Sequence, residues 1–345
     1  MRKLFIIAIS LILVLNAVSH VFAVSQAAVL FLMISPGARA AGMGEAFVAM
    51  ADDATAAYWN PAGLAFQDGR EITLMHANWL PQLVSDMYYD FFAYRQHFES
   101  LGGTLGGNVT YLNMGEQVHM DEHGVDLGTF QSWDLAVTLS YATKISPNFG
   151  LGIGVRYIHS HLAPIGAGTE KGKGVADGFA LDIGILYKVT FIPGLSFGAN
   201  LSNMGPKITY IDAAQADPLP TNLKVGLAYK LLELEYNELT ITVDTNKLLV
   251  VRHGDEAEEF YRALFSAWTD EKADKLISSI GLEYGYSDMI FLRGGYYYDE
   301  DGKVKYPSFG AGLKYSRFRF DFAYVAAEQG HPLSDTMRFS LSIGI

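Results

Sequence analysis

Apolar and polar side chains alternate with a period of two residues through almost the whole chain from residue 70 to its end. The final segment shows the pattern clearly, because its apolar residues occupy every second position: Met337, Phe339, Leu341, Ile343 and Ile345. Successive side chains of a β-strand point to opposite faces, so this period predicts strands with one apolar face. The alternation predicts fourteen strands, at residues 70–79, 88–98, 101–113, 131–145, 149–161, 174–190, 194–203, 221–232, 237–250, 276–287, 289–298, 305–315, 317–327 and 336–345.

The connections between these strands alternate in length. Those after even-numbered strands are tight, whereas most of those after odd-numbered strands are long: 80–87, 114–130, 162–173, 204–220, 251–275, 299–304 and 328–335. Outer-membrane barrels have short periplasmic turns and long external loops, and an even strand number leaves both ends on the periplasmic side. A soluble sandwich, the alternative, has no reason for this asymmetry. We therefore predict an all-β fold, a 14-stranded antiparallel transmembrane β-barrel formed by residues 70–345.

Residues 1–23 have the features of a secretory signal peptide. Arg2 and Lys3 precede an apolar run from Leu4 to Leu15, and small residues lead to a cleavage site after Ala23. A membrane anchor is the alternative, but a spanning helix needs about 20 apolar residues. Cleavage leaves 23 basic and 37 acidic residues, a net charge of −14. We expect export through the inner membrane to the outer membrane and no nucleic-acid partner, which would require a basic surface.

The polar face of the predicted strands carries charges of both signs, and in a barrel this face lines the lumen. The inward set is Arg156, Asp182, Asn200, Lys224, Asp244, Glu283, Arg293, Lys314, Arg319, Asp321 and Arg338. Ion pairs that brace the wall are the interpretation we favour, and a water-lined path is the alternative. Many inward positions are glycine, which leaves room inside the barrel. Residues 24–69 are the candidate plug.

Two motifs stand out in this candidate plug, which is rich in glycine and other small residues. The first runs from Ile34 to Glu45 and the second from Trp59 to Ala62. Glycine allows close backbone packing, Asn60-Pro61 begins a turn, and Asp52-Asp53 is expected to cap a short helix through Tyr58. The candidate plug residues are Ser35, Pro36, Arg39, Gly42, Met43, Gly44, Glu45, Trp59, Asn60 and Pro61.

These motifs resemble those of the PorV/PorQ family of outer-membrane barrels, which is related in architecture to the FadL hydrocarbon transporters. Four C-terminal segments resemble the PorV branch more specifically: Gly281 to Tyr284, Leu292 to Tyr296, Gly310 to Tyr315, and His331 to Leu341. The resemblance covers the mature chain from about residue 28 to the end. It implies a FadL-like barrel with an N-terminal plug or hatch.

The resemblance also implies a function in type IX secretion. Such barrels sit beside a giant translocon barrel, receive secreted cargo through its C-terminal signal domain, and pass it to a surface attachment complex. The implied partners are therefore outer-membrane lipid, the translocon and the cargo, with no cofactor. The alternative is a FadL-like transporter of hydrophobic small molecules, which should have a contiguous apolar pocket near the hatch.

The connection at 251–275 has a helical rather than a strand period. Tyr261, Leu264, Phe265 and Trp268 fall at positions i, i+3, i+4 and i+7. Their aromatic face is a candidate partner-binding surface on the external side. Packing of the same face against the mouth of the barrel is the alternative.

Residues for catalysis or metal binding are not arranged in any convincing pattern. The chain has no cysteine, which excludes thiolate metal sites and cysteine nucleophiles. His159 and His161 could share one strand face, and His119 and His123 share a polar loop, but such pairs are common on exposed surfaces. No nucleophile elbow is present. We expect a protein that is not an enzyme and binds no metal.

Overall fold

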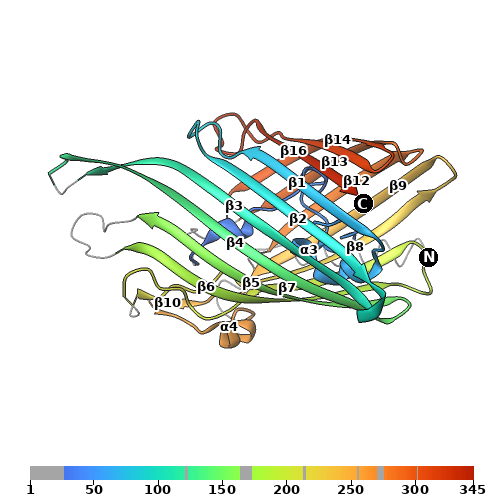
Figure 1. The fold of residues 1–345 in the computed structure, drawn as a ribbon, viewed down its shortest axis with the longest axis horizontal. Helices are drawn as coiled ribbons and strands as arrows, with labels where there is room; N and C mark the ends of the chain where they lie inside the picture. Colours follow the sequence, from blue (N-terminus) through green and yellow to red (C-terminus); the bar gives the residue numbers. More distant parts are fainter. Residues whose placement is uncertain are drawn as a thin grey trace.

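The computed structural model describes residues 27–120, 123–163, 173–212, 215–254, 256–269, 276–300 and 302–345. The predicted signal peptide, residues 1–23, lies outside the described residues. Fourteen strands of the described part form a closed antiparallel barrel (Figure 1). They are β1 (Arg70–Asn78), β2 (Tyr88–Phe98), β3 (Gly103–Met120), β4 (Asp126–Ser146), β5 (Phe149–Ala163), β6 (Gly174–Lys188), β7 (Leu195–Met204), β8 (Asn222–Glu233), β9 (Asn237–Leu248), β12 (Ile277–Tyr286), β13 (Ile290–Asp299), β14 (Val304–Tyr315), β15 (Phe318–Val325) and β16 (Thr336–Gly344).

The barrel closes where its first strand meets its last. β1 pairs with β16 from Glu71↔Gly344 to Ala77↔Arg338. The backbone amide of Ile345 donates a hydrogen bond to the carbonyl oxygen of Arg70 at 3.0 Å. Closure leaves no free sheet edge, which a strand in a membrane could not tolerate. The predicted 14-stranded antiparallel barrel is confirmed.

The β3–β4 hairpin differs most from the sequence prediction. Residues 114–130 were expected to form a long loop, but β3 continues to Met120 and β4 begins at Asp126. Pairing resumes at Glu116↔Gln131, after a register shift beside Gly115, whose φ is +77°. A glycine that accepts positive φ lets the chain bulge and then continue the ladder, so it does not end the strand here. Figure 1 shows the two strands extending beyond their neighbours.

The outer face of the wall is apolar and its inner face is polar. Outward-pointing side chains in mid-strand positions are exposed and apolar, among them Leu139, Ile153, Leu181, Leu292, Phe309 and Leu313. Inward-pointing positions on the same strands hold buried Thr138, Ser140, Asp182 and Arg293. This is the distribution of a barrel surrounded by lipid. Among the described residues, no helix is both long enough and apolar enough to cross a membrane.

Residues 27–69, called the N-terminal segment below, lie within the barrel (Figure 1). The segment holds four short helical elements: η1 (Leu30–Met33), α2 (Ala38–Ala41), α3 (Ala56–Trp59) and η2 (Pro61–Phe66). α2 packs against β14, β15 and β16, whereas η2 packs against β3 to β6. Elements outside the wall and the segment are η3 (Glu99–Leu101), β10 (Arg252–His253), β11 (Glu256–Ala257) and α4 (Phe260–Ser266).

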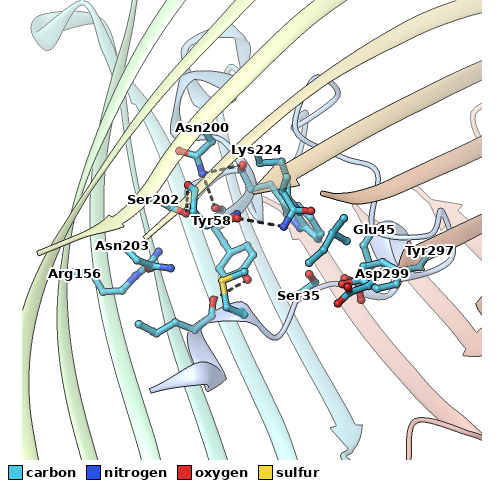
Figure 2. A pocket seen from close by; sticks show the side chains of 16 residues that line it. Ser35, Glu45, Tyr58, Arg156, Asn200, Ser202, Asn203, Lys224, Tyr297 and Asp299 are labelled. Atoms are coloured by element: carbon cyan, nitrogen blue, oxygen red, sulfur yellow. Dashed lines mark hydrogen bonds between the residues drawn. The ribbon is translucent and has the colours of Figure 1, made fainter. Parts of the chain in front are cut away.

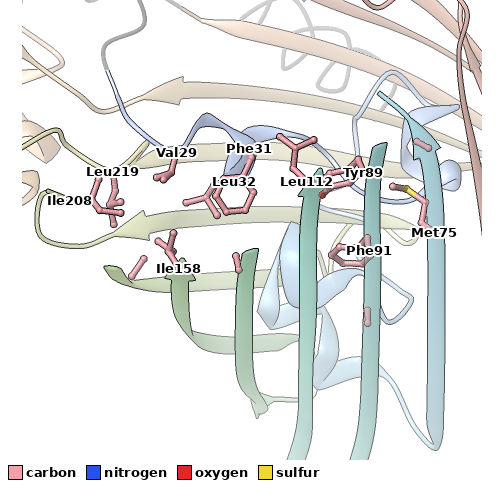
Figure 3. Close-up of a cluster of buried hydrophobic side chains, with 14 of the residues drawn as sticks. Val29, Phe31, Leu32, Met75, Tyr89, Phe91, Leu112, Ile158, Ile208 and Leu219 are labelled. Atoms are coloured by element: carbon pink, nitrogen blue, oxygen red, sulfur yellow. The ribbon is translucent and has the colours of Figure 1, made fainter. Parts of the chain in front are cut away.

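A hydrophobic cluster joins the start of the N-terminal segment to the inner wall. Val29, Phe31 and Leu32 are buried against residues of β1 to β5 and of the connection between β7 and β8. Figure 3 shows these side chains facing Met75, Tyr89, Phe91, Leu112, Ile158, Ile208 and Leu219. The apolar part of the lumen is therefore filled by the chain itself.

Candidate functional site

Arg39 links α2 to the barrel wall at β12. Its guanidinium donates from Nε to one carboxylate oxygen of Glu283 at 2.9 Å and from an Nη to the other at 2.7 Å. The same group lies 2.5 Å from an Asp52 oxygen and 3.2 Å from an Asp53 oxygen. Two parallel bonds fix the guanidinium plane as well as its charge, which a lysine could not do.

Glu283 continues this network along the wall. Arg293 lies 2.6 Å from Glu283 and 2.8 Å from Asp321, and its side chain is 0% exposed. Arg319 lies 3.4 Å from Glu283 and 3.1 Å from Asp321. Three guanidinium groups thus face four carboxylates across β12, β13, β15 and the N-terminal segment. Such close charge balance is what allows ionised groups to be buried.

Glu45, Arg338 and Asp244 hold other parts of the segment. Arg338 donates to the backbone carbonyl of Ser35 and lies 3.2 Å from Glu45. Tyr306 donates its hydroxyl to the same Glu45 at 3.1 Å. One carboxylate oxygen of Asp244 accepts hydrogen bonds from the backbone amides of Phe47 and Val48, at 2.7 and 2.9 Å.

Asn60 and Trp59 fix the position of the second motif, Trp59 to Ala62, by hydrogen bonds. The fully buried Asn60 amide donates to the carbonyls of Val48 and Ile185 at 2.9 and 3.0 Å, and its oxygen accepts from the Ala62 amide at 3.1 Å. Pro61 follows at the first position of η2, where the lack of an amide hydrogen is harmless. The Trp59 indole donates to the Pro36 carbonyl at 3.1 Å, joining the two motifs.

Glycines let the segment approach the wall backbone to backbone. A Cβ on Gly295 of β13 would lie 2.1 Å from the Gly44 nitrogen, and one on Gly152 of β5 would lie 2.3 Å from the Pro61 carbonyl carbon. A Cβ on Gly42 would likewise lie 2.9 Å from the Cα of Gly310 on β14. Met43, beside these contacts, is fully buried in a cluster with Phe47 and Trp59.

Arg156 and Asp182 form a separate inward pair on β5 and β6. Their charged groups lie 2.6 Å apart, and the second oxygen of Asp182 accepts from the Asn203 amide at 2.8 Å. Arg156 also donates to the side chains of Thr138 and Asn203. Lys314, in contrast, lies at the short-turn end of the barrel, partly exposed and 2.6 Å from Asp288. Sequence reasoning placed Lys314 among the lumen-facing charges, but the structure does not place it within the buried networks.

A polar cavity of about 210 Å³ remains between the N-terminal segment and the barrel wall. Its walls come from the segment and from β5, β7, β8, β9, β12 and β13. Figure 2 shows Arg156 and Asn203 at one side of this space and Glu45 and Asp299 at the other, with Asn200 and Lys224 between them. Burial raises the pKa of the Tyr58 hydroxyl well above its ordinary value, so it lines the cavity as a neutral group.

The helical prediction for the connection after β9 corresponds to α4, preceded by the small β10–β11 hairpin. Leu264 packs toward a small cluster with Leu249, Val251 and Ala263. Tyr261, Phe265 and Trp268 are exposed, and Phe265 has 78% of its surface accessible. Tyr261 and Phe265 therefore project from α4 into the surroundings, whereas Trp268, two residues beyond α4, lies with its ring centroid 5.4 Å from the Lys247 ammonium of β9.

Sequence reasoning missed how some of these residues combine. Asp52 and Asp53 were expected to cap a helix, and the Asp53 carboxylate does accept a hydrogen bond from the Thr55 backbone amide at 2.9 Å, just before α3. Both aspartates also contact Arg39, a contact that was not predicted. The acidic pair that begins thirteen residues after Arg39 was the sequence signal that could have predicted this contact. The amides of Asn200, Asn222 and Asn246 all line the cavity, although only Asn200 was placed in the predicted inward set.

The histidine pairs considered from the sequence lie among aromatic rings. Within the described ranges, no cluster of three or more His, Asp and Glu is placed to hold a metal ion. His159 and His161 pack on the Trp133 ring, with centroids 5.0 and 5.5 Å apart, and His159 contacts Asp177 at 2.8 Å. His119 packs edge-on to Phe130.

Comparison with known proteins identifies the family. A family model described as type IX secretion system protein PorV matches residues 19–254, more than half of the chain. The chain belongs to the PorV family. No curated protein sequence matches it. The family assignment predicted from the two N-terminal motifs is confirmed.

Solved structures with the same fold are FadL-like barrels. The toluene transporter TodX of Pseudomonas putida aligns with a TM-score of 0.54 at 14% identity, over 90% of this chain and 99% of that one. A FadL homologue from Pseudomonas aeruginosa gives 0.52 at 11% identity, over 88% and 96% of the two chains. The toluene transporter TbuX of Ralstonia pickettii gives 0.50 at 14% identity, over 89% and 96%. This PorV-family protein is therefore a FadL-like barrel of the outer membrane.

Proposed function

We propose that this PorV-family barrel binds the C-terminal signal domains of secreted cargo and shuttles them from a type IX translocon to the surface attachment machinery, without catalysing a reaction. The observation that carries the proposal is the exposed aromatic surface formed by Tyr261 and Phe265 of α4 and by Trp268, which follows the helix. Exposed aromatic side chains of this size are typical anchors of protein interfaces. They lie in a long connection, on the side that outer-membrane barrels turn outward.

The contacts of the N-terminal segment support the second part of this proposal, that residues 24–69 act as a plug. Of these, the described residues from 27 onward contact β3 to β6 on one side and β14 to β16 on the other. Arg39, Glu45 and Asn60 anchor the segment by buried polar contacts on three regions of the wall. A lumen filled in this way suits a protein that acts through its outer loops.

Transport of hydrophobic small molecules is the second candidate, and the fold shared with the toluene transporters favours it. Such transport requires an apolar pocket beside the hatch. The cavity beside the N-terminal segment is instead lined by Glu45, Arg156, Lys224, Asp299 and several amides. This polar lining supports the cargo proposal over hydrocarbon transport.

The test is a mild-detergent pulldown of the tagged protein from native outer membrane, with mass spectrometry of the proteins recovered. Wild type should recover a very large barrel and secreted proteins that share a C-terminal domain. The Phe265→Ala, Trp268→Ala double variant should lose most of the cargo. Phe191→Ala is the matched control, because Phe191 is 74% exposed in the short turn after β6, at the opposite end. A lone barrel that carries bound lipid or fatty acid would contradict the proposal and favour transport.

A further inference from the structure

The polar cavity contains a cationic group for which the described residues supply no hydrogen-bond acceptor. Lys224 projects inward from β8, and its ammonium nitrogen lies 4.3 Å from the centroid of the Trp59 ring. Within the described residues, no carboxylate lies within salt-bridge distance of it, and the charges of Asp244 on β9 and Glu45 act on the ammonium from farther away. An ammonium carries three donors, and a buried one needs acceptors or water. The Trp59 face stabilises the charge but accepts no ordinary hydrogen bond.

Asn200, on the neighbouring strand β7, presents an acceptor to the same cavity. Its side-chain nitrogen donates to the Trp59 carbonyl at 3.1 Å, which fixes the orientation of the amide. Its oxygen has no hydrogen-bond partner, although the residue is only 4% exposed. A buried acceptor without a partner costs about 1–3 kcal/mol. A ligand hydroxyl would remove this penalty.

Asn222 and Asn246 complete this side of the cavity. The amide of Asn246 donates to the side-chain oxygen of Asn222 at 3.2 Å, so the Asn222 nitrogen and the Asn246 oxygen remain available for other partners. Both residues are buried and line the cavity. One donor and one acceptor therefore stand beside the ammonium and the Asn200 oxygen.

The opposite side of the cavity is acidic. Glu45 and Asp299 lie there together with the Tyr297 ring (Figure 2). Carboxylates accept hydrogen bonds from hydroxyl groups and repel anions. The charge asymmetry gives a ligand one orientation, with its anionic group at Lys224 and its hydroxyl groups toward Glu45 and Asp299.

We propose that this cavity is a binding site for a small hydroxylated carboxylate, a molecule of the size and chemistry of a simple sugar acid. The carboxylate pairs with the Lys224 ammonium and the Asn222 amide. The hydroxyl groups donate to the Asn200 and Asn246 oxygens and to the acidic side. A volume of about 210 Å³ admits a molecule of this size. The site is distinct from the α4 surface, and its occupancy does not depend on cargo binding.

Isothermal titration calorimetry on the purified mature protein in detergent tests this proposal, with D-glucuronate as the probe. Glucuronate should bind saturably, whereas D-glucose, which lacks the carboxylate, and acetate, which lacks the hydroxyl groups, should each bind at least about tenfold more weakly. Lys224→Gln should weaken glucuronate binding by at least about tenfold, and Lys224→Arg should retain most of it. Lys314→Gln is the matched control, because Lys314 lies outside the cavity and should leave binding unchanged.

Three results would overturn the proposal. Absence of saturable heat up to about 10 mM glucuronate would mean that the cavity holds only water. Equal affinity for acetate would reduce the site to a simple anion site, and equal affinity of Lys224→Gln would place binding elsewhere. Should Lys224→Gln fail to show heat-modifiable folding, Asn246→Asp takes its place. Its added negative charge beside the ammonium should weaken glucuronate binding but not glucose binding.

Discussion

Arg39 in α2 and Glu283 on β12 form a two-pronged ion pair between residues 244 positions apart, with N–O distances of 2.7 and 2.9 Å. The pair ties the N-terminal segment to the wall through a carboxylate that Arg293 and Arg319 also contact. Because the pair is buried, removal of one partner leaves an uncompensated charge in a medium that solvates it poorly.

Arg39→Ala should release the first half of the N-terminal segment without opening the barrel. Loss of a buried ion-pair partner costs about 3–5 kcal/mol, and here the cost falls on local docking because the strands hold the wall. Amide hydrogen exchange over residues 38–45 should rise by about a hundredfold or more, while the strands stay protected. Arg317→Ala, at an exposed arginine in the β14–β15 turn, is the control and should exchange like wild type. Unchanged exchange in Arg39→Ala would mean that the pair does not hold the segment.

Gly295→Ala should disturb the packing of the segment, whereas Gly294→Ala should not. The new Cβ at position 295 would lie 2.1 Å from the Gly44 backbone, which cannot rotate away, and at position 294 it meets nothing within 4 Å. We expect a loss of about 1–3 kcal/mol for the first and less than about 0.5 kcal/mol for the second. The measurement is the temperature at which each variant loses its folded mobility in a gel. Equal midpoints for the two neighbours would refute close packing of Gly44 on β13.

Acid should loosen α4. The Ser266 hydroxyl and the His253 ring both bond to the Glu258 carboxylate and hold its pKa below the ordinary value. A lowered folded-state pKa means that the stabilisation is present above about pH 4.3 and is lost as the pH falls through the lower folded value. The chain has no cysteine, so a spin label on Phe265→Cys reports on α4 alone. Its mobility should increase below about pH 4 in wild type, but it should be high and independent of pH in the Glu258→Gln background.

The period of the side chains was enough to predict the wall, because every strand must keep one face in lipid and the other in the lumen. The same period predicted that Arg156, Asp182, Asp244, Glu283, Arg293, Arg319, Asp321 and Arg338 face the lumen. All of them except the partly exposed Arg319 are buried. Their partners could not be predicted. Whether Glu283 meets Arg39 or Arg338 depends on barrel curvature and on the path of the N-terminal segment, and neither has a local signal.

In the β3–β4 hairpin, the sequence prediction failed for the wall itself. Gly115, Gly124 and Gly128 have the local chemistry of loops, and all three adopt positive φ. Pairing continued across two of them because a strand pair can absorb a glycine as a bulge. The sequence therefore indicated where the backbone turns but not whether hydrogen bonding resumes afterwards.

Wild-type protein should not bind toluene, whereas Phe31→Ala should. Phe31 is 3% exposed in the hydrophobic cluster between the N-terminal segment and the wall, so its truncation should destabilise the protein by about 3–5 kcal/mol and leave an apolar void. Such voids stay dry and accept small aromatic molecules. Toluene should therefore raise the unfolding midpoint of Phe31→Ala but not that of wild type. Leu30→Ala, at an exposed position of η1, is measured in the same micelles to correct for toluene dissolved in the detergent. A toluene-dependent rise in wild type would show that the segment leaves an apolar site open, and it would shift the balance from cargo binding to transport.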